Sequence, residues 1–208
     1  MTGDDGSFSR RQDAIQADLW HGSAMRKTGR RHFLRSVGTM TLGIAAARAA
    51  RSAADLPRSL SFVHTHTGEQ LTAEYFDGSV YRGPVLQQVN QLLRDFRTED
   101  VFPIDPAVLD RLFWLRSATG RDEPFHVISG YRSPVTNAAL RARSGGVAEN
   151  SLHMQGRAID VRLPGTPTAQ LALLAQRQAN GGVGYYRVSD FIHVDTGRVR
   201  NWGDTIVP

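Results

Sequence analysis

The chain has 208 residues, a formal net charge of +5 and no cysteine. Disulfide bonds and thiolate metal ligands are therefore excluded. From residue 50 onward the chain contains 17 arginines, no lysine and 16 acidic residues. This part is nearly neutral, which argues against a basic nucleic-acid-binding surface.

Residues 25–54 have the features of a twin-arginine signal peptide. Paired arginines, an aromatic residue and a leucine stand in Gly29–Arg35, and a modestly hydrophobic stretch, Ser36–Ala47, follows them. That stretch is too short and too weakly apolar to span a membrane stably. Small-residue cleavage sites come next. We expect export by the twin-arginine translocase into the periplasm, with the signal then removed.

A polar leader, residues 1–24, precedes this signal. Met25 is a second candidate start, because Met25-Arg26-Lys27 would provide an ordinary basic region at the beginning of a signal peptide. Met1 and Met25 both remain compatible with the sequence. With the second start, the leader would not be translated.

Residues 55–208 are expected to form one α+β domain, long enough for a sizeable core. Apolar and polar residues alternate on both sides of Gly68-Glu69, which predicts a hairpin over residues 59–76. Apolar residues at helical spacing predict two helices within residues 80–118, with Asp105 as the N-cap of the second.

From Phe125 on, short apolar runs alternate with glycine-rich turns, and one helix is predicted near residues 167–179. The predicted fold is an N-terminal hairpin and helices followed by a small antiparallel sheet that carries a zinc site. The predicted strands of that sheet are 125–129, 157–163, 181–186 and 191–195.

Two histidines and up to three carboxylates fall within two short segments of this sheet. The first segment contains His153 and Asp160, and the second contains Asp190, His193 and Asp195. Two imidazoles and one carboxylate match the three protein ligands of a catalytic zinc, which leaves a fourth position for water. A further carboxylate nearby could take a proton from that water. The alternative is a polar, hydrogen-bonded core.

The sequence resembles the murein endopeptidase K-like family, which is related to zinc D-alanyl-D-alanine carboxypeptidases and dipeptidases. The resemblance runs from about Ser59 to Trp202. Its motifs are Ser129–Ser133, the pattern SxHxxGxAxD at 151–160, and the segment 181–202. It implies a periplasmic Zn²⁺ hydrolase that cuts crosslinks between peptidoglycan stem peptides, of either the 4–3 or the 3–3 type.

The resemblance also implies roles for individual residues. His153, Asp160 and His193 match the zinc ligands of the family. Arg132 matches the arginine that holds the scissile carbonyl or its oxyanion.

The general base has two candidates. Several members of the family place a catalytic glutamate three residues before the second histidine, and here that position is Asp190, one methylene shorter. Asp195 is the competitor, because strand alternation places it on the same face as His193. If Asp190 is the base, Asp195 is expected to orient an imidazole.

Two other functions compete with the endopeptidase. The first is a catalytically silent peptidoglycan-binding module that keeps the fold. The second is a D,D-carboxypeptidase acting on stem-peptide ends, which would need a positive pocket for a free carboxylate. His64 and His66 could form a second metal site, although exposed hairpin residues are the simpler interpretation.

Overall fold

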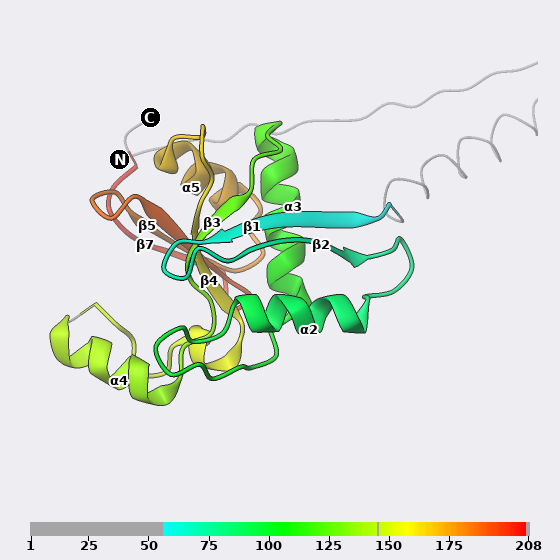
Figure 1. Ribbon diagram of the computed structural model, residues 1–208. Coiled ribbons are helices and arrows are strands. Elements are labelled where there is room, and N and C mark those ends of the chain that lie inside the picture. Colours follow the sequence, from blue (N-terminus) through cyan, green and yellow to red (C-terminus); the bar gives the residue numbers. More distant parts are fainter. Residues whose placement is uncertain (1–55, 145, 207–208) are drawn as a thin grey trace, which may run out of the picture. The chain divides into compact units, whose positions relative to one another are not determined.

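The computed structural model describes residues 56–144 and 146–206. The leader and signal peptide predicted over residues 1–54 therefore lie outside the described residues. The described residues form a seven-stranded mixed sheet, four α-helices and one short 3₁₀ helix (Figure 1). None of the helices within these ranges is long and apolar enough to cross a membrane.

The predicted hairpin is confirmed. Strands β1 (Arg58–His64) and β2 (Gln70–Phe76) pair antiparallel. Strand β3 (Phe125–Ser129) pairs with β1 in parallel. A parallel pair needs a long crossover connection, and here it contains helices α2 (Gly83–Leu92) and α3 (Pro106–Thr119).

The remaining strands continue the same sheet beyond β3. Strand β4 (Ala158–Arg162) pairs antiparallel with β3 and with β6 (Phe191–Asp195). Strand β5 (Gly182–Tyr186) pairs antiparallel with β6 and parallel with β7 (Arg200–Gly203). The strand order is β2-β1-β3-β4-β6-β5-β7.

The predicted α+β class is confirmed, but the sheet is larger than predicted and is mixed rather than antiparallel. The hairpin belongs to the same sheet as the later strands, and two of its pairs, β1–β3 and β5–β7, are parallel. Alternation of apolar and polar residues shows that a segment is a strand, but it does not show which neighbour the strand pairs with or in which direction.

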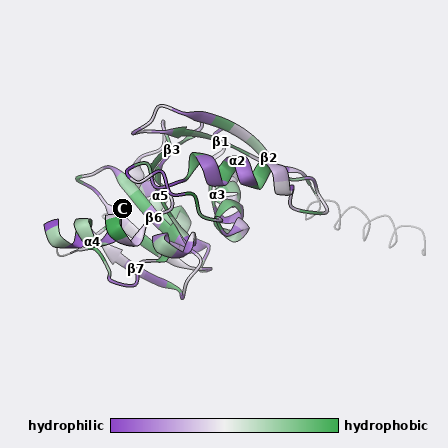
Figure 2. Ribbon diagram, turned by 60° about the horizontal axis from the view of Figure 1, so that its bottom comes forward, coloured by the Kyte–Doolittle hydropathy of each residue, from purple (hydrophilic) through white to green (hydrophobic). Residues whose placement is uncertain are grey.

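Helices α3 and α5 (Thr168–Arg177) pack together against one face of the sheet, while α2 lies along β2 (Figure 1). Purple and green segments alternate along α2 in Figure 2, as expected for a helix with one buried side. The predicted N-cap of α3 is confirmed, since the Asp105 side chain accepts a hydrogen bond from the backbone N–H of Ala107 at 2.9 Å.

In strands β4 and β6, alternate residues belong to the hydrophobic core. These are Ile159, Val161, Ile192 and Val194, all of which are fully buried. Asp160 and His193 lie between them in the two strands and therefore point to the opposite face. That face carries the polar site described below.

The sequence did not predict helix α4 (Pro134–Arg143), the 3₁₀ helix η1 (Leu152–Gln155) or strand β7. A start signal for α4 was present, because the Ser133 side chain caps the helix at the N–H of Thr136 and Pro134 occupies its first turn. Ser and Pro are equally common in turns, so the signal alone does not identify a helix. Strand β7 has only four residues and one large apolar side chain, too few for a periodic pattern.

Replacing Gly156 by alanine is expected to destabilise the fold more than the same change at Gly120. Both glycines have a positive φ, 64° and 66° respectively, and the left-handed conformation alone costs alanine about 1–2 kcal/mol. A Cβ at Gly156 would also collide with the main-chain oxygen of Pro103, whereas a Cβ at Gly120 would meet no atom of the described chain within 4 Å. We expect an additional loss of about 1–3 kcal/mol at Gly156 in denaturant unfolding. Equal losses of unfolding free energy in the Gly156→Ala and Gly120→Ala variants would contradict this difference in packing.

Candidate metal centre

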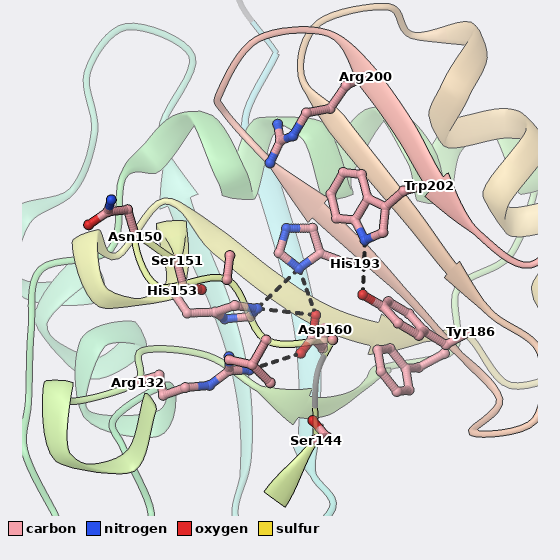
Figure 3. Close-up of a pocket in the computed structure, with 14 residues that line it drawn as sticks. Arg132, Ser144, Asn150, Ser151, His153, Asp160, Tyr186, His193, Arg200 and Trp202 are labelled. Carbon is pink, nitrogen blue, oxygen red and sulfur yellow. Dashed lines mark hydrogen bonds and ion pairs between the residues drawn. The ribbon is translucent and has the colours of Figure 1, made fainter. Parts of the chain in front are cut away.

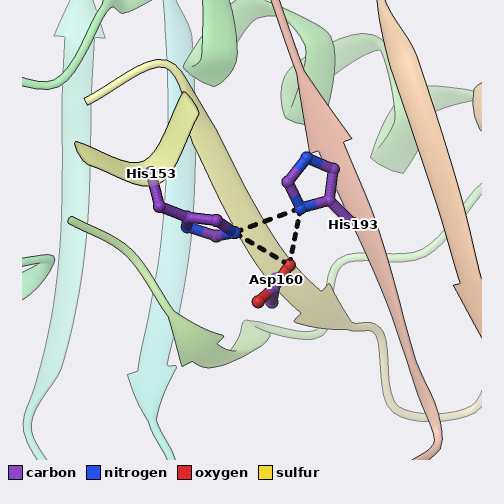
Figure 4. A group of neighbouring side chains, drawn as sticks. All are labelled: His153, Asp160 and His193. Atoms are coloured by element: carbon purple, nitrogen blue, oxygen red, sulfur yellow. Dashed lines mark hydrogen bonds and ion pairs between the residues drawn. The ribbon is translucent and has the colours of Figure 1, made fainter. Parts of the chain in front are cut away.

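The three proposed ligands come from three neighbouring elements. His153 lies in η1, Asp160 in β4 and His193 in β6. Asp160 and His193 are direct partners in the antiparallel register of β4 and β6. The 3₁₀ helix ends at Gln155, and the left-handed conformation of its C-cap, Gly156, turns the chain into β4 with His153 beside that strand (Figure 4).

The ligand atoms of these residues converge on one point. Nε2 of His153 lies 3.2 Å from Oδ1 of Asp160 and 3.1 Å from Nδ1 of His193. Nδ1 of His193 lies 2.9 Å from the same carboxylate oxygen (Figure 4). All three side chains are buried. Two imidazole nitrogens and one carboxylate oxygen in this arrangement could hold a divalent metal ion.

Hydrogen bonds behind the ligands fix which ring nitrogen faces the centre. Nδ1 of His153 lies 2.7 Å from the main-chain oxygen of Gly130, which can only accept, so this nitrogen carries the proton. Nε2 of His193 lies 3.0 Å from Oδ2 of Asp195 and donates to that carboxylate. The lone pairs of the two opposite nitrogens are thereby left to face the metal position, which is how histidine ligands are commonly oriented.

The electrostatics of Asp160 and His153 suit metal binding. Burial acts to raise the pKa of Asp160, but the neighbouring His153 and His193 hold that pKa well below its usual range. Burial lowers the pKa of His153. At His193 burial opposes protonation, yet its hydrogen bonds to Asp160 and Asp195 raise the pKa overall. An ionised Asp160 and a neutral His153 are the protonation states that a metal ion requires of its ligands.

The cluster lies against a pocket of about 590 Å³. Arg132 and His153 line one part of this pocket, and the aromatic side chains of Tyr186 and Trp202 line another (Figure 3). Phe191 is also a lining residue. The rings of Tyr186 and Phe191 stack with centroids 4.6 Å apart. The site therefore combines ligand atoms and a cation with a half-buried aromatic wall, as expected for a cleft that binds an organic substrate.

Arg132 is buried beside the carboxylate ligand. Its Nη2 lies 3.4 Å from Oδ2 of Asp160 and 3.4 Å from Oγ of Ser129, and its Nη1 lies 3.5 Å from Oδ1 of Asn137. These contacts are at the long limit for hydrogen bonds. Nε of Arg132 has no partner among the described residues. Because its Nη contacts are long, the guanidinium keeps donor capacity for an oxygen atom placed in the pocket.

Asn137 is a residue of the site that the sequence analysis did not single out. Its side chain is buried on α4, and its amide nitrogen donates to the main-chain oxygens of Ala148 and Glu149 at 3.1 and 3.3 Å. Its oxygen faces Arg132. Asn137 thus joins the arginine to the loop at the pocket edge. This role could not be predicted from the sequence, because helix α4, which carries Asn137, was not predicted.

Asp195 lies behind His193. Its side chain is fully buried and does not line the pocket. Oδ1 accepts hydrogen bonds from the backbone N–H groups of Gly182 and Gly197 at 3.0 and 2.8 Å, and Oδ2 accepts from His193. This placement fits a carboxylate that orients an imidazole. It leaves no path to a proton in the pocket, so the geometry does not support Asp195 as the base.

Asp190 is not brought into the site either. It stands in the turn before β6 with a positive φ of 52°. Its carboxylate accepts a hydrogen bond from Oγ1 of Thr168 and lies 3.5 Å from Nη1 of Arg162. Its side chain is 60% exposed and does not line the pocket.

Replacing Asp190 by asparagine is expected to leave hydrolysis and metal content close to wild type, because the carboxylate lies outside the pocket. Asparagine tolerates the left-handed conformation, so the turn is retained. The change in stability should stay within about 0.5 kcal/mol. Steady-state kinetics and metal analysis are the measurements, with Asp122→Asn as an exposed control. A variant that keeps its metal and loses turnover would show that Asp190 reaches the substrate during catalysis.

The other histidine pair differs from its predicted environment. His66 is exposed, but His64 is buried, and its Nδ1 accepts from the backbone N–H groups of His66 and Thr67 at 3.3 and 3.4 Å. The His66 ring stacks on Phe96 with centroids 4.2 Å apart. Within residues 56–144 and 146–206, a convergent group of three metal-binding side chains is found only at His153, Asp160 and His193.

Comparison with known proteins identifies the family. Residues 52–202 match the family model described as peptidoglycan L,D-endopeptidase MepK. The chain belongs to this family. The MepK L,D-endopeptidases of Escherichia coli K12 and Shigella flexneri are each 43% identical to it over 146 residues, which is 70% of this chain and 80% of the relative.

A probable MepK L,D-endopeptidase of Haemophilus influenzae is also 43% identical, over 147 residues, with 70% of this chain and 79% of the relative covered. The matched MepK region includes all three candidate ligands and Arg132. Membership of the MepK family confirms the family predicted from the sequence and, with it, the predicted enzyme class, a metallopeptidase that is a peptidoglycan endopeptidase.

Proposed function

We propose that the protein is a zinc-dependent L,D-endopeptidase that hydrolyses peptide crosslinks of peptidoglycan in the cell envelope. Family membership and the activity named for its 43%-identical relatives support the substrate class. The observation that carries the proposal is the convergence of three buried ligand atoms beside Arg132 at the pocket.

His153, Asp160 and His193 would hold the zinc ion. When bound, the ion supplies a water molecule whose pKa falls to about 7, so that hydroxide is available at neutral pH. Residues of the chain orient the ligands and stabilise the charge that develops on the substrate. Gly130 and Asp195 keep the two imidazoles in the ligating orientation. The guanidinium of Arg132 donates to the oxygen of the scissile amide and stabilises the negative charge that develops there.

The names of the relatives support one bond type. Their names specify an L,D-endopeptidase, an enzyme that cuts between an L-configured and a D-configured centre within a peptide. Of the two crosslinks left open by the sequence, the 3–3 type contains such a bond, whereas the 4–3 type joins two D centres. We therefore propose the 3–3 crosslink between stem peptides as the substrate.

Export completes the proposal. The paired arginines and weakly hydrophobic stretch of residues 25–54 support recognition by the twin-arginine translocase, with residues 55–208 as the zinc peptidase domain in the periplasm. A fusion of residues 25–54 to a folded reporter would test this. Replacing Arg30 and Arg31 together by lysine should then abolish export of the reporter.

Removing the metal is expected to abolish crosslink hydrolysis reversibly. The protein beginning near residue 55 is incubated with purified peptidoglycan that contains both crosslinks, and the released muropeptides are read by mass spectrometry. A strong chelator, given time to exchange, should stop the loss of 3–3 dimers, and added Zn²⁺ should restore it. Full activity in the chelator would refute the metal mechanism.

The same digest separates the alternative functions. Dimers left intact by folded, zinc-loaded protein would indicate a silent peptidoglycan-binding module. Release of a terminal D-alanine with the dimers intact would indicate a D,D-carboxypeptidase. Loss of 4–3 dimers alone would overturn the proposed bond type.

A further inference from the structure

We propose that Arg200 is a positioning residue for the metal centre, acting through Asp195 to fix the His193 imidazole in its ligating orientation. The inference rests on the proposed metal centre and extends it to a strand that contributes no ligand. It assigns a role to β7, the edge strand that pairs with β5.

Both terminal nitrogens of the Arg200 guanidinium contact the carboxylate of Asp195. Nη1 lies 3.1 Å from Oδ1, and Nη2 lies 2.7 Å from Oδ2 of the same carboxylate. Oδ2 is also the atom that accepts from Nε2 of His193. A two-point arginine–carboxylate contact fixes the plane of the carboxylate as well as its position. Arg200 therefore sets the direction from which Asp195 accepts the hydrogen bond of the imidazole N–H.

The burial of Asp195 favours a cationic partner in addition to the N–H groups that already donate to it. The carboxylate is 0% exposed, and a buried charge without a partner is strongly unfavourable. A second arginine, Arg111 of α3, donates to the main-chain oxygen of Asp195 and holds the strand from the helical side. Arg200 contacts the carboxylate itself, while half-buried at the pocket wall.

The space for this contact is kept free by glycines. A Cβ at Gly182 would collide with the Arg200 guanidinium and with the carboxylate of Asp195. A Cβ at Gly197 would lie 2.9 Å from Oδ1 of Asp195 and 3.2 Å from Nη1 of Arg200. Both glycines also donate their backbone N–H groups to Oδ1. The backbone is thus shaped around the pair formed by Asp195 and Arg200.

The same arginine reaches the aromatic wall. Its Cζ lies 4.6 Å from the ring centroid of Trp202, whose Nε1 donates to the hydroxyl of Tyr186 at 2.9 Å. The ring centroids of Trp202 and His193 are 5.1 Å apart. Figure 3 shows Arg200 and Trp202 next to His193 in the pocket. Strand β7 therefore contacts the proposed metal ligand His193 in two ways. Trp202 contacts it directly, and Arg200 contacts it through Asp195.

Metal affinity is the direct readout, and it requires no peptidoglycan. Zn²⁺ alone is titrated into the metal-free protein in competition with a chromophoric chelator, and Co²⁺ alone is titrated to record its visible absorption bands. Loss of a residue that orients a histidine ligand typically costs 10–100-fold in affinity. We expect Arg200→Met to weaken Zn²⁺ binding by about this factor and to shift the Co²⁺ bands.

Arg198→Met is the matched control, because Arg198 is an exposed arginine two residues away with no side-chain contact to Asp195 among the described residues. The Zn²⁺ affinity of Arg198→Met should equal that of the wild type. Arg200→Lys keeps the charge and loses the two-point contact, so an intermediate affinity is expected. If Arg200→Met does not fold, as judged by thermal unfolding, the lysine variant carries the test.

A double-mutant cycle shows whether Arg200 acts through Asp195. Asp195→Asn should itself weaken metal binding, and adding Arg200→Met to it should cause little further loss. Additive effects, or wild-type affinity in both Arg200 variants, would overturn the inference.

The outcomes also separate this inference from the proposed function. A wild-type protein that binds neither Zn²⁺ nor Co²⁺ would refute the metal centre and the inference together. A wild-type protein that binds zinc tightly and leaves peptidoglycan intact would refute the enzyme only. The dependence on Arg200 would still support the positioning role.

Discussion

Alanine at His153, Asp160 or His193 is expected to abolish both metal retention and hydrolysis. Each substitution removes one of three ligand atoms that lie 2.9–3.2 Å apart. Two remaining ligands do not form a zinc site of ordinary affinity. Without the ion, the acidified water and its charge are both lost, so we expect activity to fall by more than about 10³-fold. Metal analysis after dialysis and the muropeptide digest are the two measurements.

A histidine of the same sheet serves as the control. His126 lies on β3 and does not belong to the ligand group. His126→Ala should keep one metal ion and its activity. Hydrolysis at wild-type rate by a variant that lacks one of the three ligands would contradict the assignment of the centre.

Arg132→Met is expected to lower kcat by about 10²–10³-fold while leaving zinc bound. The guanidinium contacts its neighbours only at 3.4–3.5 Å, so its donors are available to the oxygen on which charge develops. An interaction made mainly in the transition state changes kcat and kcat/KM together. Kinetics on a soluble crosslinked dimer, with metal analysis of the same preparation, would measure this.

Lysine at the same position distinguishes charge from geometry. Arg132→Lys keeps a cation but not the planar fork, so only partial recovery of kcat is expected. A rise in KM with kcat unchanged would assign Arg132 to ground-state binding. Loss of zinc from both variants would show instead that Arg132 supports the ligand Asp160, which it contacts at 3.4 Å.

Much of the site could be predicted because its residues obey strand periodicity. Asp160 and His193 stand in short strands with buried neighbours, and alternation correctly placed Asp195 on the side of His193. The hairpin, α3 with its N-cap and the four later strands also followed from local patterns.

The parts that escaped prediction depend on contacts between distant segments. Asp190 lies three residues before His193, an odd spacing that places the two on opposite faces of a regular strand. Its positive φ, in the turn before β6, does not bring it to the pocket. Strand β7 was missed because its four residues gain their role from Asp195 and Trp202 rather than from a pattern of their own.

The order of the strands has a consequence for how the molecule assembles. β1 pairs with β3 across some sixty residues, Phe62 opposite Phe125, and the ligands Asp160 and His193 meet only when β6 has been inserted beside β4. Pairings between such distant segments must close long loops before they gain stabilising contacts, which slows folding. A metal ion at this centre would meet its full set of ligands only after β4 and β6 have paired.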